Sequence, residues 1–173
     1  MSCPITLAGI AKDCKGIGGV KNIWLADRSL VDDVTITANE IDDIEPAALF
    51  AGKKYSTRKQ VAVMESVWNV DEEAGTAFVE TTLQAAFAKM DKTKRLEINA
   101  LAIGDVVALV EDNNGNFWYL GLEHPVTLQE GGGSTGQAFG DANQYTITLV
   151  DQASVLPYPV TSAAALAATT APE

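Results

Sequence analysis

The chain has 173 residues, and 47% of them are hydrophobic, so it is long enough and apolar enough to form one domain with a substantial core. Its net charge of −11 is unevenly distributed, because all 12 Lys and Arg residues lie at or before Arg95. Nucleic-acid binding depends on Lys and Arg that neutralise phosphates, so this distribution argues against specific nucleic-acid binding.

The sequence also argues against a membrane protein and against secretion through a signal peptide. No apolar run approaches the roughly 20 residues that cross a bilayer, and the N-terminus lacks the charged and then apolar regions of a secretory signal. Cys3 and Cys14 are the only cysteines. They could pair, but without an export signal we expect reduced thiols that are buried or half-buried. Cys-x10-Cys without a second pair or a nearby histidine is a poor zinc signature.

The N-terminal part predicts strands separated by turns. The glycines from Gly16 to Gly19 predict a turn that leads into a strand from Val20 to Ala26. A phosphate-binding loop would need a helix after these glycines, and the strand-like residues that follow argue against one. Alternation is only partial from Leu30 to Thr37, and seven acids lie between Asp27 and Glu45.

The next segment contains the main group of positive charges in this half of the chain. Residues 45–50 fit a short helical turn or a loop. Four basic residues between Lys53 and Lys59 fit a solvated strand edge or loop. Such a cluster could also contact the acidic segment Asp27–Glu45 of a neighbouring copy.

Residues 60–70 and 75–90 predict a long β-hairpin. In the first run, alternation places Val63, Glu65 and Val67 on one face. Asp71, Glu72 and Glu73 form an acidic tip between the runs. The second run also fits helical spacing, but its threonines and its position after a glycine turn favour a strand.

Residues 91–104 predict the α-helix of the fold. Asp91 or Thr93 can cap its N-terminus, and Gly104 ends it. Leu96, Ala100 and Ile103 would form its apolar stripe.

Residues 105–122 predict a second hairpin around Asn114 and Gly115, because this pair tolerates the positive φ angles of a type I′ turn. Counting outward from a two-residue loop places Glu111 opposite Trp118, Leu109 opposite Leu120, Val107 opposite Leu122, Val110 opposite Tyr119 and Ala108 opposite Gly121. A strand from Tyr145 to Val150 would extend this sheet after a glycine-rich loop, Gly131–Gly136. The loop fits a flexible connector better than a ligand-binding loop.

The last residues, Pro157 to Glu173, are mostly Pro, Ala, Thr and Ser. Such a segment has little apolar surface to offset the entropy of ordering. We expect it to be held as an arm against neighbouring copies in an assembly, with packing on its own domain, residues 1–156, as the alternative.

Candidate catalytic, cofactor-binding and metal-binding residues are not apparent. His124 is the sole histidine and fits a loop position, so a catalytic triad is improbable. Asp112 begins a stretch that superficially resembles a calcium loop, but the expected strand after Asn116 favours a hairpin turn. The acids Asp71, Glu72 and Glu73 fit a solvated turn, or the wall of a negatively charged channel if the chain forms rings.

Three motifs together resemble virion structural proteins of tailed phages and prophages of Bacteroidota-type hosts. They are Asp112-Asn-Asn-Gly-x-Phe-Trp-Tyr-Leu-Gly121, Ser134-Thr-Gly-x-Ala-x-Gly-Asp141 and Tyr145-Thr-Ile-Thr-Leu149. The start of the chain, Cys3-Pro-Ile-Thr with Gly18-Gly-Val-Lys-x-Ile-Trp-Leu25, is similar to the start of the same group. The likeness spans most of residues 1–156, and within the group it is greatest to tail tube proteins.

The resemblance implies a mainly β fold, a β-sandwich or small barrel of antiparallel hairpins with one flanking α-helix. It implies a non-enzymatic protein without cofactors that assembles in the host cytoplasm and resides in the virion. Its partners would be copies of itself, in stacked hexameric rings with an acidic DNA-conducting lumen, and other virion proteins. The alternative is a capsid decoration protein, whose acids would face solvent. An enzyme or small-molecule binder, with His124 and Asp141 as the residues to test, is a third and weaker alternative.

Overall fold

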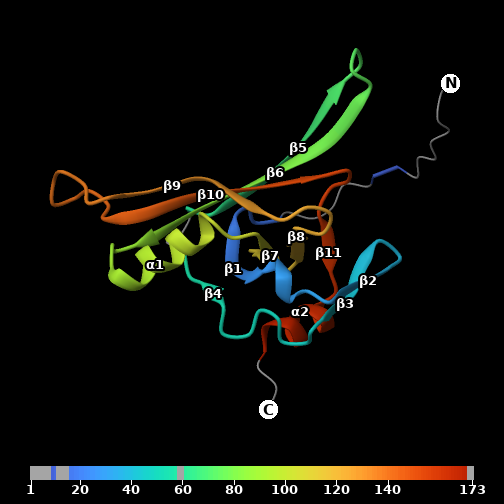
Figure 1. Ribbon diagram of the computed structural model, residues 1–173, viewed down its shortest axis with the longest axis horizontal. Coiled ribbons are helices and arrows are strands. Elements are labelled where there is room, and N and C mark those ends of the chain that lie inside the picture. Colours follow the sequence, from blue (N-terminus) through green and yellow to red (C-terminus); the bar gives the residue numbers. More distant parts are fainter. Residues whose placement is uncertain (1–8, 11–15, 58–60, 171–173) are drawn as a thin grey trace.

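The computed structural model describes residues 9–10, 16–57 and 61–170, which form two β-sheets, two α-helices and one 3-10 helix (Figure 1). The strands are β1 (Val20–Asp27), β2 (Asp33–Thr37), β3 (Glu40–Glu45), β4 (Lys54–Tyr55), β5 (Val63–Asp71), β6 (Thr76–Ala88), β7 (Val106–Asp112), β8 (Phe117–Leu120), β9 (Thr127–Ser134), β10 (Gln144–Ala153) and β11 (Tyr158–Val160). The helices are η1 (Arg28–Leu30), α1 (Lys92–Leu101) and α2 (Ser162–Thr169). The expected mainly β sandwich with a flanking helix is confirmed.

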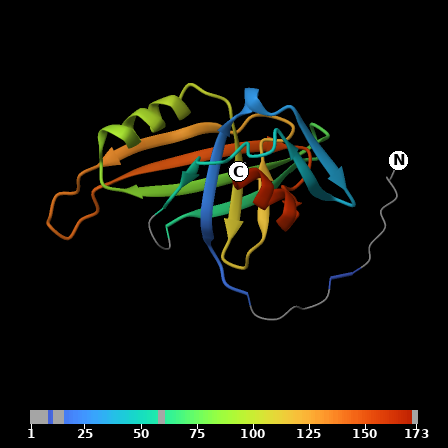
Figure 2. The ribbon, with the colours of Figure 1, turned by 90° about the horizontal axis from the view of Figure 1, so that it is seen from below.

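The two sheets differ in size and direction. The larger sheet has seven strands in the order β2-β3-β11-β8-β7-β1-β4, and the smaller sheet has four in the order β5-β6-β10-β9. All neighbours in the smaller sheet are antiparallel. Figure 1 shows the smaller sheet lying across the larger one, with the β5–β6 hairpin extending past it, and Figure 2 shows α1 beside the smaller sheet.

The centre of the larger sheet is buried on both faces. Ile23 of β1 and Val110 of β7 point toward the smaller sheet, where they share a hydrophobic cluster with Leu149 of β10. Trp24 and Leu109, one residue away on the same strands, belong to a second cluster on the opposite face. Because both faces are buried, β7 is an almost continuous apolar run, as expected for a fully buried strand.

The C-terminal segment closes the second cluster. Ala164, Ala165 and Ala168 of α2 are buried there, and the Phe50 N–H donates to the Ala168 carbonyl at 2.8 Å. The expectation that neighbouring copies hold this segment is therefore wrong for residues 158–169, which pack on their own domain. Their small side chains let the helix approach the sheet closely.

Several predicted elements are confirmed. The strand from Val20, the long β5–β6 hairpin and the helix α1 all form. Asp91 is the N-cap of α1, since its carboxylate accepts from the Lys94 N–H at 2.9 Å. Gly104 ends the helical turns by donating its N–H to the Ala100 carbonyl at 3.0 Å. Of residues 45–50, for which a helical turn or loop was expected, Glu45 ends β3 and residues 47–50 form turns.

The predicted turn at Asn114 and Gly115 forms, but its type is wrong. Only Gly115 has a positive φ, +88°, whereas a type I′ turn requires positive φ at both central positions. The Asp112 N–H donates to the Asn116 carbonyl at 2.9 Å, which leaves a three-residue loop. The glycine then occupies the left-handed position that follows a type I turn.

The longer loop shifts the pairing of β7 and β8 by one residue. Leu109 lies opposite Tyr119 instead of Leu120, and Glu111 lies opposite Phe117 instead of Trp118. Because side chains alternate between faces, this shift moves every β8 side chain to the other side relative to the prediction.

The prediction for the glycine-rich region is also corrected. The strand from Tyr145 forms within β10, but it lies between β6 and β9 in the smaller sheet instead of extending the β7–β8 pair. Gly131 to Ser134 belong to β9 and are not a loop. A Cβ on Gly133 would come within 2.7 Å of side-chain atoms of Met90 and Tyr145, so glycine is needed for close packing at that position.

The predicted apolar stripe of α1 is wrong. Leu96 and Ile103 are 53% and 92% exposed. The helix instead buries Leu101 and packs Ile98 against the main cluster. A Cβ on Gly131 would meet the Ile98 side chain at 3.7 Å, so the bare backbone of β9 leaves room for this face of the helix.

Two buried polar atoms have no hydrogen-bond partner among the described residues, the Tyr119 hydroxyl and Oδ1 of Asp151. The other Asp151 oxygen accepts from the Gly121 N–H at 3.2 Å. Burial raises the pKa of Asp151 and outweighs this hydrogen bond, and the negative charge of Glu123 acts in the same direction. Burial also raises the pKa of Tyr119 to about 12.

If α2 is part of the folded core, Ala165→Leu should destabilise the protein by about 1–3 kcal/mol, because the site is fully buried and extra methyl groups there would overpack the core. Ala163→Leu is the matched control, since Ala163 is exposed on the same helix. Chemical denaturation measures both. Equal stability of the two variants would contradict the packing of α2.

The raised pKa of Asp151 predicts a specific pH dependence. The folded protein holds this proton more tightly than the unfolded chain, so the contribution of Asp151 to stability decreases as pH rises from the ordinary aspartate range through the raised folded pKa. Asp151→Asn keeps an oxygen for Gly121 and removes the titration. Its melting temperature relative to wild type should therefore be most favourable at neutral pH and decline as pH falls toward about 4. A difference that does not vary with pH would contradict this account.

Candidate assembly surfaces

The distal half of the β5–β6 hairpin stands free of the domain. Every residue from Val67 to Phe78 is exposed, on both faces of the hairpin (Figure 1). This segment includes large apolar side chains, with Trp68 48% and Val70 66% exposed. An isolated two-stranded ribbon is only marginally stable in water, so a partner surface would stabilise this one.

The acids at the hairpin tip have different roles. The Asp71 carboxylate accepts from the N–H groups of Glu73 and Ala74 at 2.9 and 3.0 Å, so it holds the turn. The side chains of Glu72 and Glu73 form no hydrogen bond or ion pair with any described residue. The sequence predicted their position at the tip correctly, and these two acids are available to a partner.

The smaller sheet has an outer face that points away from the core. Strand alternation and pairing place these residues on it: Val63, Glu65, Val67, Asn69, Asp71, Thr76, Phe78, Glu80, Thr82, Gln84, Ala86, Ala88, Thr127, Glu130, Gly132, Ser134, Gln144, Thr146, Thr148, Val150 and Gln152. Its charged residues are all acids, and among the described residues of these four strands it carries no Lys or Arg. Gln152 donates to Glu80 across this face at 3.0 Å.

The smaller sheet also has two free edges, β5 and β9. Each presents backbone N–H and C=O groups that no described strand pairs, and such edges are templates for pairing with another chain. β5 is nine residues long, and β9 is eight. Neither edge carries a Lys or a Pro, which proteins commonly use to block such pairing.

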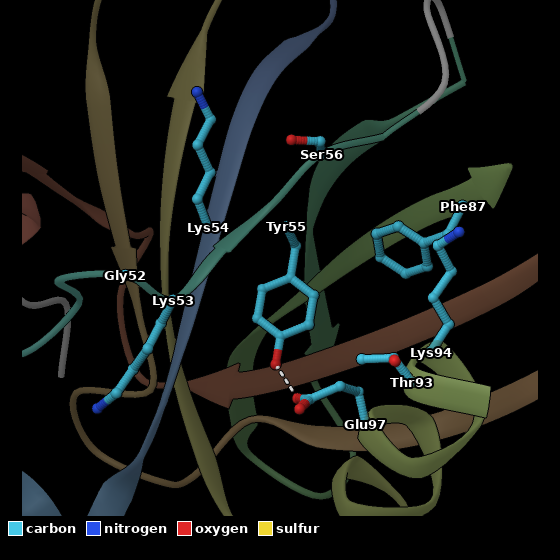
Figure 3. Close-up of a pocket in the computed structure, with 9 residues that line it drawn as sticks. All are labelled: Gly52, Lys53, Lys54, Tyr55, Ser56, Phe87, Thr93, Lys94 and Glu97. Carbon is cyan, nitrogen blue, oxygen red and sulfur yellow. Dashed lines mark hydrogen bonds between the residues drawn. The ribbon is translucent and has the colours of Figure 1, made fainter. Parts of the chain in front are cut away.

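A hollow of about 420 Å³ lies at the opposite end of β6 from the hairpin tip, between β4 and α1 (Figure 3). We call it the Tyr55 hollow. The rings of Tyr55 and Phe87 form its apolar wall, with centroids 6.1 Å apart. The Tyr55 hydroxyl donates to Glu97 at 2.8 Å, and burial together with this carboxylate raises the tyrosine pKa.

Three lysines line the Tyr55 hollow. Lys94 is largely neutralised, because its ammonium binds the Asp91 carboxylate at 2.9 Å and two backbone carbonyls. The Lys53 ammonium donates only to the Leu49 carbonyl, and the Lys54 ammonium lies 5.7 Å from the centre of the Trp24 ring. Both ammonium groups point away from the rings of Tyr55 and Phe87 (Figure 3), and Lys54 lies on the opposite face of the larger sheet, so their positive charge lies outside the hollow.

Asn114 has a structural role that the sequence did not predict. Its side chain binds both the N–H and the carbonyl of Ile17, each at 2.8 Å. Asn113 donates to the Gly18 carbonyl at 2.7 Å. The turn therefore holds the glycine-rich segment before β1.

The remaining acids singled out from the sequence act within turns. Hydrogen bonds from the side chain of Asn116 and from the N–H groups of Asn116 and Asn114 lower the pKa of Asp112 despite an opposing contribution from burial. The N–H groups of Ala138 and Gln137 lower the pKa of Asp141. Both carboxylates thus already bind local donors, as structural acids do.

Other sequence candidates do not come together into a reactive site. His124 lies in a shallow depression beside Glu123 and Ser154, away from the Tyr55 hollow. Within the part of the chain that the structure describes, no three His, Cys, Asp or Glu residues are grouped so that they could hold a metal ion. Neither described helix has the length and apolar character of a membrane span. Cys3, Cys14, Arg58 and Lys59 lie outside the described residues.

Sequence reasoning missed the Tyr55 hollow and the extent of the acidic face. Glu80 and Glu130 could have been assigned to it only with the strand pairing known, because β6 and β9 are joined through β10. The alternation of Val63, Glu65 and Val67 was predicted correctly and was the available signal. Comparison with known proteins does not extend these assignments, because no family model, curated protein or solved structure matches the chain.

Proposed function

We propose that the chain is a structural protein of a phage virion that self-assembles into stacked rings forming a tail tube, and that it performs no chemistry of its own. The observation that carries the proposal is the outer face of the smaller sheet, which bears acids and no cations between two free edges. The motifs between Asp112 and Leu149, together with the start of the chain, carry the resemblance to tail tube proteins on which the specific assignment rests.

The strand directions of the smaller sheet suit ring closure. Four antiparallel strands alternate in direction, so β5 and β9 at the two edges run in opposite directions. When copies related by rotation are placed side by side, β9 of one copy and β5 of the next are therefore antiparallel. Six copies would contribute about 24 strands, more than the roughly 16–18 that already leave an aqueous channel in porins.

The charge of the outer face suits a channel that conducts DNA. In such a ring, Glu65, Glu80 and Glu130 would repeat around the lumen, with Asp71 toward the hairpin tip. A surface of like charge repels the phosphate backbone and prevents DNA from adhering to the wall.

A capsid decoration protein is the second candidate, and the charge on β2 and β3 favours it. Glu40, Asp42, Asp43 and Glu45 are exposed there, away from the outer face of the smaller sheet. A decoration protein would present such acids to solvent and would associate as a monomer or trimer with a capsid lattice.

The first prediction of the tail tube proposal concerns assembly. Purified protein should form rings of six copies or tubes with an open lumen, visible by negative-stain electron microscopy and matched by the mass from light scattering. Monomers or trimers at high concentration would contradict it and favour decoration, which binding to empty capsids then tests.

The second prediction locates the lateral contact. In a background with Cys3 and Cys14 replaced by serine, Val67→Cys on β5 and Gly132→Cys on β9 should be joined between copies by a short bis-maleimide. Denaturing electrophoresis should show a ladder that ends at the ring size. Thr35→Cys on β2 combined with Gly132→Cys is the matched control, because β2 is an edge of the other sheet. A ladder only with the control pair would contradict the β5–β9 contact.

A further inference from the structure

We propose that Trp68 of one copy packs on the glycine-rich edge strand β9 of a second copy, opposite Gly131, and that this contact sets the register between the two joined sheets. The inference rests on the proposed self-assembly through β5 and β9, and it identifies the side chain that holds this contact. The receiving surface is Gly131 together with the side chains of Leu128 and Ile98 beside it. We call it the Gly131 site.

The Gly131 site is an apolar patch at a free sheet edge, and its central residue has no side chain to cover it. A Cβ on Gly131 would lie 3.1 Å from a methyl carbon of Leu128 and 3.7 Å from one of Ile98. Both side chains are only half-buried and lie at the margin of the main cluster. Figure 2 shows α1, which carries Ile98, beside β9. An aromatic side chain on an adjacent strand supplies the cover that such an edge glycine lacks.

Trp68 is an exposed aromatic side chain on β5, the other free edge of the same sheet. Alternation along β5 places it on the same face as Met64, which packs against the main cluster. Gly131 faces this side as well, because it lies opposite the buried Ile147. When β5 of one copy continues the sheet beyond β9 of the next, Trp68 therefore lies on the face that carries the Gly131 site.

The charges and the bulge of β9 select one register for the joined edges. A shift by one residue would turn the outer face of one sheet toward the inner face of the other. With Trp68 opposite Gly131, no two acids of β5 and β9 face each other. A shift of two residues in one direction would place Asp71 opposite Glu130, and like charges directly opposite destabilise a sheet. A shift of two in the other direction would place Trp68 opposite Gln129, the extra residue of a bulge, and leave Gly131 uncovered.

Trp68 supplies the specificity that backbone pairing lacks. Hydrogen bonds between two strands form in any register that matches the faces, so they do not select one. Trp68 lies near the middle of the nine-residue strand β5, and hence near the centre of the joined edges. A Trp side chain buries about 150–250 Å², and aromatic anchors at the centre of an interface carry much of the binding energy.

The first test measures lateral association by sedimentation velocity and light scattering over a range of concentrations. Trp68→Ala should lower the association constant by more than about tenfold, and Trp68→Phe, which keeps an aromatic ring, should lower it less. Phe78→Ala is the matched control. Phe78 is also exposed on the free hairpin, but it lies on the outer face of β6, which is not a sheet edge. Circular dichroism checks the fold of each variant.

The second test determines the register with disulfides and leaves Trp68 in place. Directly opposite residues of antiparallel strands have Cα atoms about 4.5–5.5 Å apart, which lies within the range that a disulfide bridges. In the serine background described above, Val67→Cys with Gly132→Cys should form disulfides between copies under mild oxidation. A Cβ on Gly132 would meet nothing within 4 Å, so the fold accommodates this change. The shifted pairs, Val67→Cys with Glu130→Cys or with Ser134→Cys, should not form them.

The outcomes separate this inference from the proposed function. A wild-type protein that stays monomeric at every concentration would overturn both. Rings formed as readily by Trp68→Ala as by wild type, or an equal loss in Phe78→Ala, would overturn the Trp68 contact and leave the tail tube proposal standing. A disulfide only in a shifted pair would overturn the register. A loss confined to the Trp68 variants, with a disulfide only in the Val67 and Gly132 pair, would support the contact.

Discussion

The fold depends on the burial of both faces of β7. Val107 and Leu109 point to one side and Ala108 and Val110 to the other, and none of the four has measurable exposure. Full burial of a Val or Leu side chain contributes about 1.5–3 kcal/mol, so this one strand anchors two apolar layers. The smaller sheet packs on one of these layers, and α2 packs on the other. A shift of β7 would therefore disrupt both.

Because these two layers complete the core, the outer face of the smaller sheet and the distal hairpin are left without a cover. Trp68 and Val70 lie on the part of the hairpin that extends beyond the domain, and both side chains stay exposed in the single chain. Their burial therefore does not stabilise the isolated domain. Exposed apolar side chains on an extended element indicate a contact with another molecule. Their position beside Glu72 and Glu73 makes that contact one that charge can direct.

The sequence predicted elements that have a clear hydrophobic period or a cap. It did not predict features that depend on contacts between residues far apart in the sequence. Alternation located β5, whereas threonines and the preceding glycine turn identified β6 as a strand. Asp91 marked the start of α1 through the chemistry of an N-cap. The predicted register of β7 and β8 was wrong because Asn114-Gly115 fits both a two-residue and a three-residue loop. The hydrogen bond between Asn114 and Ile17 joins residues that lie far apart in the sequence, so no local pattern indicates it. The exposed acids at the tip were predictable, whereas the Tyr55 hollow joins residues from three separate elements.

The C-terminal segment shows why composition misled. Alanine loses almost no side-chain entropy on folding, so an Ala-rich helix needs little buried area to be ordered once a cap and a flat surface are present. The Thr161 side chain supplies the cap by accepting from the Ala164 N–H, and β11 holds the chain beside β3 and β8. With residues 158–169 committed to their own domain, they cannot serve as an exchanged arm. Within the described chain, assembly contacts would then depend on surfaces such as the sheet edges and the free hairpin.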